Sequence, residues 1–321
     1  MIDIKLLEQL CLCNGISGDE GNVRNLIINE IKDCADDIKT DNLGNLIVFK
    51  KGKKSAKSKL MVSAHMDEVG LMVTDITSDG YLKFDEVGGI DRRVLPGKRV
   101  CVGRNGLNGV IGVKPIHLTN GDEKTAVPKM NDMYIDIGAE SREDALKYVN
   151  YGDGINFEGD FKINGKTVVT KALDDRFGCY VLINLIKSEP EYDMYFTFVV
   201  QEEVGLRGAR PAAFTVNPDF ALVIESTTAA DVAEVDASHQ VCNLSKGATV
   251  TVMDRATVYD KEMISAAFEL AEKNNIAVQY KRAVAGGNDS GAIHQSRGGV
   301  RTLAVSLPSR YIHAPSTAAK P

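Results

Sequence analysis

The sequence predicts an α/β fold, a mostly parallel sheet flanked by helices, with a small β-barrel inserted into it. In residues 1–68 and 165–321, short apolar strands are followed by segments with helical periodicity. In residues 69–164, glycines and valines recur at short intervals, as in VGLMV, GKRVCVG and NGVIGV. That spacing is typical of the short strands and turns of a small barrel. We therefore expect a discontinuous α/β domain that is interrupted by a β-rich domain.

The N-terminal elements follow from local patterns. Residues 2–13 have a broad apolar face and predict a helix. Ser17 with Glu20 three residues later predicts a capping box for a helix over about 19–34. The segment DNLGNLIVFK predicts a turn into a strand, KKGKKSAKSK a solvated loop, and KLMVSAH a strand that ends on His65.

The second half of the chain alternates strands and helices. VVTKAL leads into the helix DDRFGCYVLINLIK, then come strand YFTFVV, helix GLRGARPAA and strand FALVIES. A second set follows, with strands ATVTVM, IAVQYK and VRTLAVSL separated by the helices DKEMISAAFELAEKN and DSGAIHQS. Strands separated by helices of this length predict parallel pairing and a sheet covered on both faces. Within the β-rich segment, SREDALKYV predicts one helix.

Composition excludes several classes of function. The net charge is −6 and there is no extended basic block, so the chain has no electrostatic reason to bind nucleic acid or an anionic membrane. No apolar run approaches the roughly 20 residues that span a bilayer, and the N-terminus has no signal-peptide pattern. The scattered cysteines form no CxxC pair, which favours reduced thiols in a cytoplasmic protein. They are Cys11, Cys13, Cys34, Cys101, Cys179 and Cys242.

Acids and histidines follow five of the predicted strands. Parallel sheets bind their ligands at the carboxyl ends of strands, so these side chains should meet at one edge. Each alone has an ordinary explanation, such as a surface histidine or a helix-capping acid. Together they would crowd carboxylates at a cost in stability unless a cation compensates them. The residues are His65 and Asp67, Asp174 and Asp175, Glu202 and Glu203, Glu225, and His313.

This inventory suits two divalent metal ions. Two ions need about three protein ligands each with one carboxylate shared, and imidazole with carboxylate suits zinc, cobalt or manganese. Two histidines and three acids provide that set and leave one acid for proton transfer. Glu202 and Glu203 are adjacent at a strand end and should point in different directions, so one can bind metal while its neighbour acts on water. Asp67 is placed to accept the second N–H of the His65 imidazole.

These residues resemble the tetrahedral (TET) aminopeptidase family of dinuclear metallopeptidases, some of whose members carry an endoglucanase label. The resemblance lies in His65-x-Asp67, KALDDR, QEEVGLRGA, VIEST and RYIHAP, and it runs over essentially the whole chain. It implies a metal-dependent aminopeptidase that removes the N-terminal residue from short peptides. Two divalent ions per subunit are implied, zinc or cobalt first and manganese as a further possibility.

The resemblance also implies a role for each residue. Glu202 would be the general base that forms the metal-bridging hydroxide, with Asp67 as a second catalytic residue, and the Asp174–Asp175 peptide bond would be cis. The β-rich insertion would be a dimerisation domain, and dimers would assemble into a hollow tetrahedral dodecamer. The metal ligands are implied to be His65, Asp174 and Glu225 for one ion, and Asp174, Glu203 and His313 for the other.

The sequence departs from the family pattern in places. Glu225 stands where the family usually has Asp, which leaves ligand geometry and metal preference open. Asn288 stands where Thr is common, so Asp289 is interpreted as a substrate-loop or structural acid rather than a ligand. Family members would continue past the equivalent of residue 321 into a helix packed on the sheet, and its loss would expose apolar surface. His117 is interpreted as structural, with a role in a neighbouring subunit's site as the alternative.

Other functions stay open at this point. A glycoside hydrolase could use two of the carboxylates, but that chemistry needs no histidine, and the chain has no Trp and only 6% aromatic residues for sugar stacking. A non-catalytic assembly protein with a vestigial metal site is a second alternative, because of Glu225. A dipeptidase or deacylase is a third. The preferred N-terminal residue does not follow from the sequence.

Overall fold

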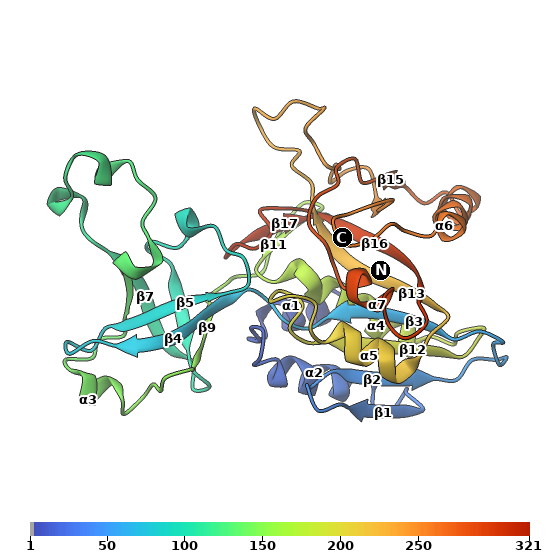
Figure 1. Cartoon of the computed structure of the whole chain (residues 1–321), viewed down its shortest axis with the longest axis horizontal. Helices are drawn as coiled ribbons and strands as arrows, with labels where there is room; N and C mark the ends of the chain where they lie inside the picture. Colours follow the sequence, from blue (N-terminus) through green and yellow to red (C-terminus); the bar gives the residue numbers. More distant parts are fainter. Residues whose placement is uncertain (1–2) are drawn as a thin grey trace.

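The computed structural model describes residues 3–321, which form a helix-covered sheet with a smaller barrel beside it (Figure 1). Within these residues, eleven strands belong to the sheet and six close into the barrel, so the predicted α/β fold with an inserted barrel is confirmed. The main path of the sheet runs β1 (Asp37–Thr40), β2 (Leu46–Lys50), β12 (Met194–Val199), β3 (Leu60–His65), β13 (Phe220–Thr228), β16 (Arg301–Arg310), β17 (Thr317–Ala319), β11 (Thr167–Thr170) and β10 (Lys162–Asn164). Off this path, β14 (Ala248–Val250) pairs with β16 and with β15 (Val278–Tyr280).

The four central strands of the sheet and β11 run in the same direction. β12, β3, β13 and β16 are neighbours and pair in parallel. β11 is antiparallel to β17, which is antiparallel to β16, so β11 shares the direction of the central strands. The carboxyl ends of these five strands therefore lie at one edge of the sheet. At the two ends of the sheet, β2 and β10 run in the opposite direction, and β1 returns to the common direction because it is antiparallel to β2.

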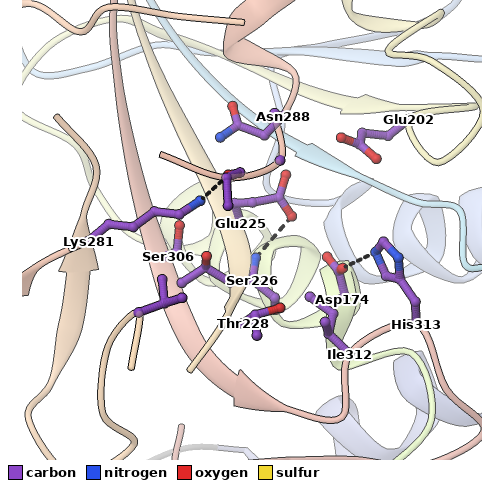
Figure 2. A pocket seen from close by; sticks show the side chains of 15 residues that line it. Asp174, Glu202, Glu225, Ser226, Thr228, Lys281, Asn288, Ser306, Ile312 and His313 are labelled. Carbon is purple, nitrogen blue, oxygen red and sulfur yellow. Dashed lines mark hydrogen bonds and ion pairs between the residues drawn. The ribbon is translucent and has the colours of Figure 1, made fainter. Parts of the chain in front are cut away.

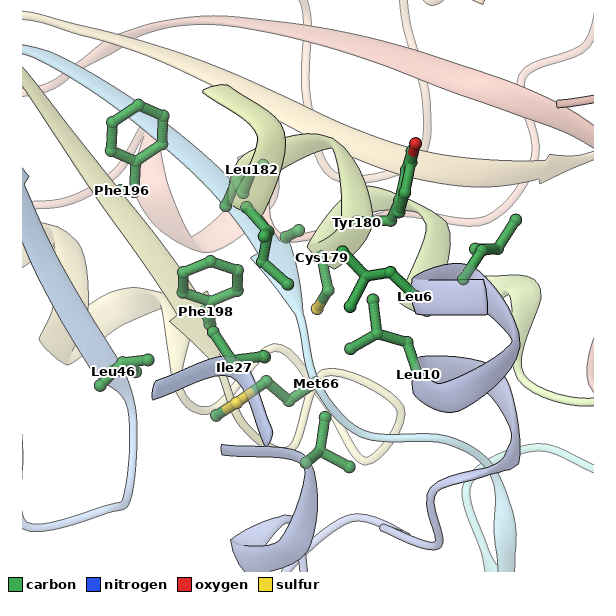
Figure 3. Packing of buried hydrophobic residues seen from close by; sticks show 14 of the residues in the cluster. Leu6, Leu10, Ile27, Leu46, Met66, Cys179, Tyr180, Leu182, Phe196 and Phe198 are labelled. Atoms are coloured by element: carbon green, nitrogen blue, oxygen red, sulfur yellow. The ribbon is translucent and has the colours of Figure 1, made fainter. Parts of the chain in front are cut away.

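Both faces of the sheet are covered by helices. Adjacent side chains on a strand point to opposite faces, so Met61 and Val62 of β3 enter different hydrophobic clusters. The cluster on the Val62 side includes α1, α2 and α4, and Figure 3 shows Phe198 of β12 and Leu182 of α4 within it. The cluster on the Met61 side includes α5, α6 and α7. The helices are α1 (Ile4–Leu12), α2 (Gly21–Ile31), α4 (Leu173–Lys187), α5 (Ala209–Val216), α6 (Lys261–Lys273) and α7 (Ser290–Ile293).

The barrel leaves the sheet after β3 and has a hydrophobic core of its own. All residues of that core lie between Val69 and Phe157, and α3 (Arg142–Ala145) packs against it through Ala145. The strand Lys162–Asn164, which the sequence pattern places in the insertion, instead pairs with β11 in the large sheet. In order around the barrel, the strands are β4 (Gly70–Ile76), β5 (Leu82–Val87), β8 (Met133–Asp136), β7 (Leu107–Val113), β6 (Arg99–Val102) and β9 (Gly154–Phe157).

The predicted capping box at the start of α2 is wrong. The helix begins at Gly21 after Glu20, and no side chain caps it. The Ser17 hydroxyl instead donates to Asp67 Oδ2 at 2.6 Å, and Glu20 Oε1 accepts from the N–H groups of Gly18 and Gln201. Ser17 therefore bonds to a residue distant in the sequence, and Glu20 bonds to Gly18 nearby and to Gln201 far along the chain, so neither caps the helix. The segment thereby connects the N-terminal loop to the carboxyl edge of the sheet.

Two further features bear on the sequence analysis. None of the helices in residues 3–321 combines the length and apolar character that a membrane crossing requires. All six cysteines carry free thiols, and Cys11, Cys179 and Cys242 are buried, as expected for reduced cysteines.

Candidate active site

The predicted site residues gather at the carboxyl edge of the sheet. Parallel strands deliver them there, because each side chain follows or ends a strand that runs in the common direction. Asp174 follows β11 and stands in the first turn of α4, and Glu225 lies within β13 itself. His65 ends β3 and is followed by Asp67, Glu202 and Glu203 follow β12, and His313 follows β16.

Asp174 lies between two imidazoles. Its Oδ1 is 3.2 Å from His65 Nε2, and its Oδ2 is 3.3 Å from His313 Nε2. Figure 2 shows the Asp174 carboxylate directed toward His313. Each oxygen of the Asp174 carboxylate therefore lies beside a different imidazole, which is the arrangement expected of a ligand that bridges two cations.

One further acid completes each group. Glu225 Oε1 is 3.4 Å from His65 Nε2, and Glu203 Oε2 is 3.3 Å from His313 Nε2. Within each group of three, the potential ligand atoms all lie within 4.8 Å of one another. The two groups are His65, Asp174 and Glu225, and Asp174, Glu203 and His313.

The backbone at Asp174 is irregular. Ala172, just before α4, adopts a left-handed conformation with φ of 53°, and the dihedral angles of Asp174 and Asp175 are not helical. The peptide bond between Asp174 and Asp175 is cis, as the resemblance implies. Asp175 is fully buried, and its Oδ1 accepts the N–H of Gly178.

Asp67 makes contacts that differ from those expected. His65 Nδ1 lies 3.0 Å from the backbone carbonyl oxygen of Asp67 but 3.5 Å from its carboxylate, so the carbonyl is the nearer acceptor. The Asp67 carboxylate accepts the N–H groups of Glu202 (3.0 Å) and Glu203 (3.1 Å) as well as the Ser17 hydroxyl. Although burial opposes it, hydrogen bonding and charge from His65 lower the pKa of Asp67. Asp67 therefore orients the backbone of the two glutamates while it remains ionised.

The electrostatics of the cluster favour a cationic occupant. Burial raises the pKa of Glu203 to about 8 and that of Glu225 to about 7, with the charge of Asp174 contributing to both. Burial also raises the pKa of Glu202 well above its usual range. Glu225 Oε2 is buried and has no hydrogen-bond partner. The three acids of the two groups outnumber the two imidazoles, and these oxygen and imidazole donors fit divalent cations.

A family model described as M42 glutamyl aminopeptidase matches residues 44–321. The chain belongs to this family. It is therefore a peptide hydrolase of the aminopeptidase type, which decides against the glycoside hydrolase and the non-catalytic alternatives. The resemblance drawn from the sequence motifs is confirmed.

Relatives of this M42 peptidase span nearly its whole length. A protein of Acetivibrio thermocellus named as an aminopeptidase is 44% identical over 97% of this chain and 91% of its own. A lysyl aminopeptidase of Pyrococcus furiosus is 33% identical over 98% of this chain and 91% of its own. The TET1 peptidase of Pyrococcus horikoshii, described as assembling into a tetrahedron or a large octahedral shell, superimposes with a TM-score of 0.87 at 40% identity, covering 98% of this chain and 94% of that one.

The M42 peptidase also contains a buried ionic cluster that the sequence analysis missed. Lys171 Nζ lies 2.7 Å from Glu68 Oε1, and Arg176 Nη2 lies 3.4 Å from the same oxygen. All three side chains are nearly or fully buried. Lys171 and Arg176 flank the two aspartates in KALDDR, so the motif already contained both cations of this buried cluster.

Asp289 and His117 lie in different surroundings. Asp289 is fully buried, neither of its carboxylate oxygens has a hydrogen-bond partner, and burial raises its pKa well above the usual range. The Asn288 side chain instead bonds the Ser290 N–H and the Tyr259 hydroxyl. His117 is exposed in a short 3₁₀ turn of the barrel (Ile116–Leu118), so it is not part of the barrel core.

Proposed function

We propose that this M42 peptidase removes single residues from the free N-terminus of short peptides, using two divalent metal ions. The observation that carries the proposal is the pair of ligand groups that share Asp174. In the proposal, His65 and Glu225 hold one ion with Asp174, and Glu203 and His313 hold the other. Zinc or cobalt suits these donors, and manganese also can. Such ions, when bound, supply Lewis-acid chemistry that acidifies the attacking water and polarises the scissile carbonyl.

Glu202 is the proposed general base. It belongs to neither ligand group, yet it lines the same cavity as Asp174, Glu225 and His313. Its burial raises its affinity for a proton, which suits a group that takes a proton from water and returns it to the leaving amine. Asp67 is the proposed positioning partner, since it holds the N–H groups of Glu202 and Glu203.

We also propose that the two parts of the chain have different functions. We assign hydrolysis to residues 1–68 and 165–321, and self-association into dimers to residues 69–164. The separate core of the barrel supports this assignment. The shells described for the P. horikoshii TET1 peptidase support further assembly of dimers into a tetrahedral dodecamer. A cytoplasmic location is part of the same proposal.

Amino-acid release from short peptides with free or acetylated N-termini tests the function. The protein is first stripped of metal, then assayed with and without added Co²⁺ or Zn²⁺. We expect release from the free peptides only, and only with metal. Release from acetylated peptides would overturn the aminopeptidase proposal, and full activity after stripping would overturn the metal dependence.

A further inference from the structure

We propose that Glu68 and Lys171 are positioning residues, whose buried ion pair fixes His65 relative to Asp174 and so sets the affinity for the metal ion that these two ligands would share. Neither Glu68 nor Lys171 belongs to a ligand group. The inference rests on the proposed two-metal function and adds to it the contacts that hold two of the ligands in place.

The ion pair is buried close to the ligands. Glu68 lies three residues after His65, and Lys171 lies three residues before Asp174. The Lys171 ammonium donates to both carboxylate oxygens of Glu68, at 2.7 and 3.0 Å, and to Asn14 Oδ1 at 3.1 Å. The two charged residues are 4% and 3% exposed. Because little water reaches either charge, the pair holds one geometry and joins the segments that carry the two ligands.

Glu68 reaches His65 through a single peptide group. The carbonyl oxygen of Asp67, which is bonded to the nitrogen of Glu68 in that group, lies 3.0 Å from His65 Nδ1. The N–H of the same group donates to the Gly15 oxygen at 3.0 Å. A carbonyl only accepts, so Nδ1 carries the proton and Nε2, which faces Asp174, is the nitrogen left for a metal ion. A shift of Glu68 would therefore turn the imidazole.

Lys171 reaches Asp174 through a backbone turn. Between them, Ala172 has a φ of 53°, in the left-handed region that a residue with a Cβ keeps only when its surroundings hold it there. The Lys171 side chain fixes one end of this turn. Beyond Asp174, Arg176 Nη2 lies 3.4 Å from Glu68 Oε1. One carboxylate thus holds the Asp174 segment from both sides.

The two proposed metal ions should depend on the pair to different extents. His65 belongs only to the group that includes Glu225, whereas Asp174 belongs to both groups. Glu203 and His313 of the other group come from segments outside the pair. A loosened pair should therefore weaken the ion beside His65 more than the second ion.

A purely electrostatic role of the two charges is the alternative. Without a change of position, loss of the negative Glu68 would weaken the binding of a cation, and loss of the positive Lys171 would strengthen it. A positioning role predicts the same sign for both, because either change breaks the pair. Asn14 provides a third test, since its removal loosens Lys171 and changes no charge.

The experiment measures Co²⁺ binding to metal-stripped protein by calorimetry. We expect two ions per subunit in wild type. Glu68→Gln and Lys171→Met should both weaken one of the two sites by about ten- to a hundredfold. Asn14→Ala should weaken the same site by about three- to tenfold. Leu182→Ala, a buried residue of α4 away from the pair, is the control for lost stability and should leave both affinities as in wild type.

Tighter binding in Lys171→Met than in wild type, or unchanged affinities in Lys171→Met and Glu68→Gln with the circular dichroism of folded protein, would overturn the positioning role. Should either variant not fold, Asn14→Ala decides, and wild-type affinity in it would also overturn the role.

A wild-type protein that binds no Co²⁺ would instead refute the proposed function. Crystal structures of metal-free wild-type and Glu68→Gln protein then test the positioning alone. We expect the His65 ring to turn away from Asp174 in the variant, and the same placement of both side chains in the two structures would overturn the inference.

Discussion

Glu202 and Glu203 are neighbours in the sequence but have different surroundings at the site. Glu203 is 3.3 Å from His313 and belongs to a ligand group, whereas Glu202 faces the cavity. We predict that Glu202→Gln lowers kcat by about 10²- to 10⁴-fold while metal content stays that of wild type. Glu203→Gln should instead lower metal content. Kinetics combined with metal analysis by mass spectrometry measures both, and near wild-type turnover in Glu202→Gln would refute its role as base.

Metal binding should depend on pH through the same side chains. In the metal-free protein, burial raises the pKa of Glu203 to about 8 and that of Glu225 to about 7. Burial opposes the shift of His313, but Asp174 and Glu203 raise its pKa to about 9. Ligands must lose their protons to bind metal, so affinity should rise between about pH 6 and about pH 9, with proton release at neutral pH. Calorimetry of Co²⁺ binding in buffers of different ionisation enthalpy measures that release, and a buffer-independent heat would contradict it.

At the residue scale, the sequence located the candidate site but not its contacts. The strand-end rule predicts which acids and histidines reach the common edge, because strand direction follows from the alternation of strands and helices. It does not predict that Ser17 donates to Asp67, because that contact joins residues 50 positions apart. The roles of the site residues remain proposals.

At the scale of elements, Arg176 connects α4 to the N-terminal segment. Its guanidinium is fully buried and donates to the backbone oxygens of Leu10, Cys13 and Met66, each at 2.7 Å. We predict that Arg176→Met lowers the free energy of unfolding by about 3–5 kcal/mol, because it leaves these buried carbonyls without their donor and removes one of the two cations beside Glu68. Urea unfolding followed by circular dichroism measures this. Arg210→Met, an exposed residue of α5, is the control and should change stability by about 0.5 kcal/mol or less.

Elements with strong periodicity were predicted well, and elements held by distant partners were not. β3 and β13 have apolar side chains on both faces, which is the pattern of central parallel strands. β1, with the sequence DIKT, is mostly exposed and exists only because it pairs with β2. All three residues of the strand Lys162–Asn164 are exposed, and the strand pairs with β11, so its own sequence could not assign it to the sheet or to the barrel.

At the scale of the whole molecule, two large apolar side chains are exposed on the barrel, the part of the chain to which we assign self-association. Ile116 and Leu118 are 65% and 55% exposed in its 3₁₀ turn, which a subunit in isolation would leave in water. We predict that light scattering gives a mass several times the 34.8 kDa of one chain, and that the double substitution Ile116→Asp and Leu118→Asp lowers it. Leu43→Asp, an exposed apolar residue outside the barrel, should leave the mass unchanged. A monomeric wild-type protein would contradict the proposed assembly.

The two ligand groups draw on residues from His65 to His313, with a complete barrel between the first ligand and the second. During translation, His65 leaves the ribosome long before the strand that brings His313 to the shared Asp174 has been made. If the two groups bind metal as proposed, a growing chain has no complete metal site until His313 has been made, and we expect no hydrolysis by the enzyme before its synthesis is nearly finished.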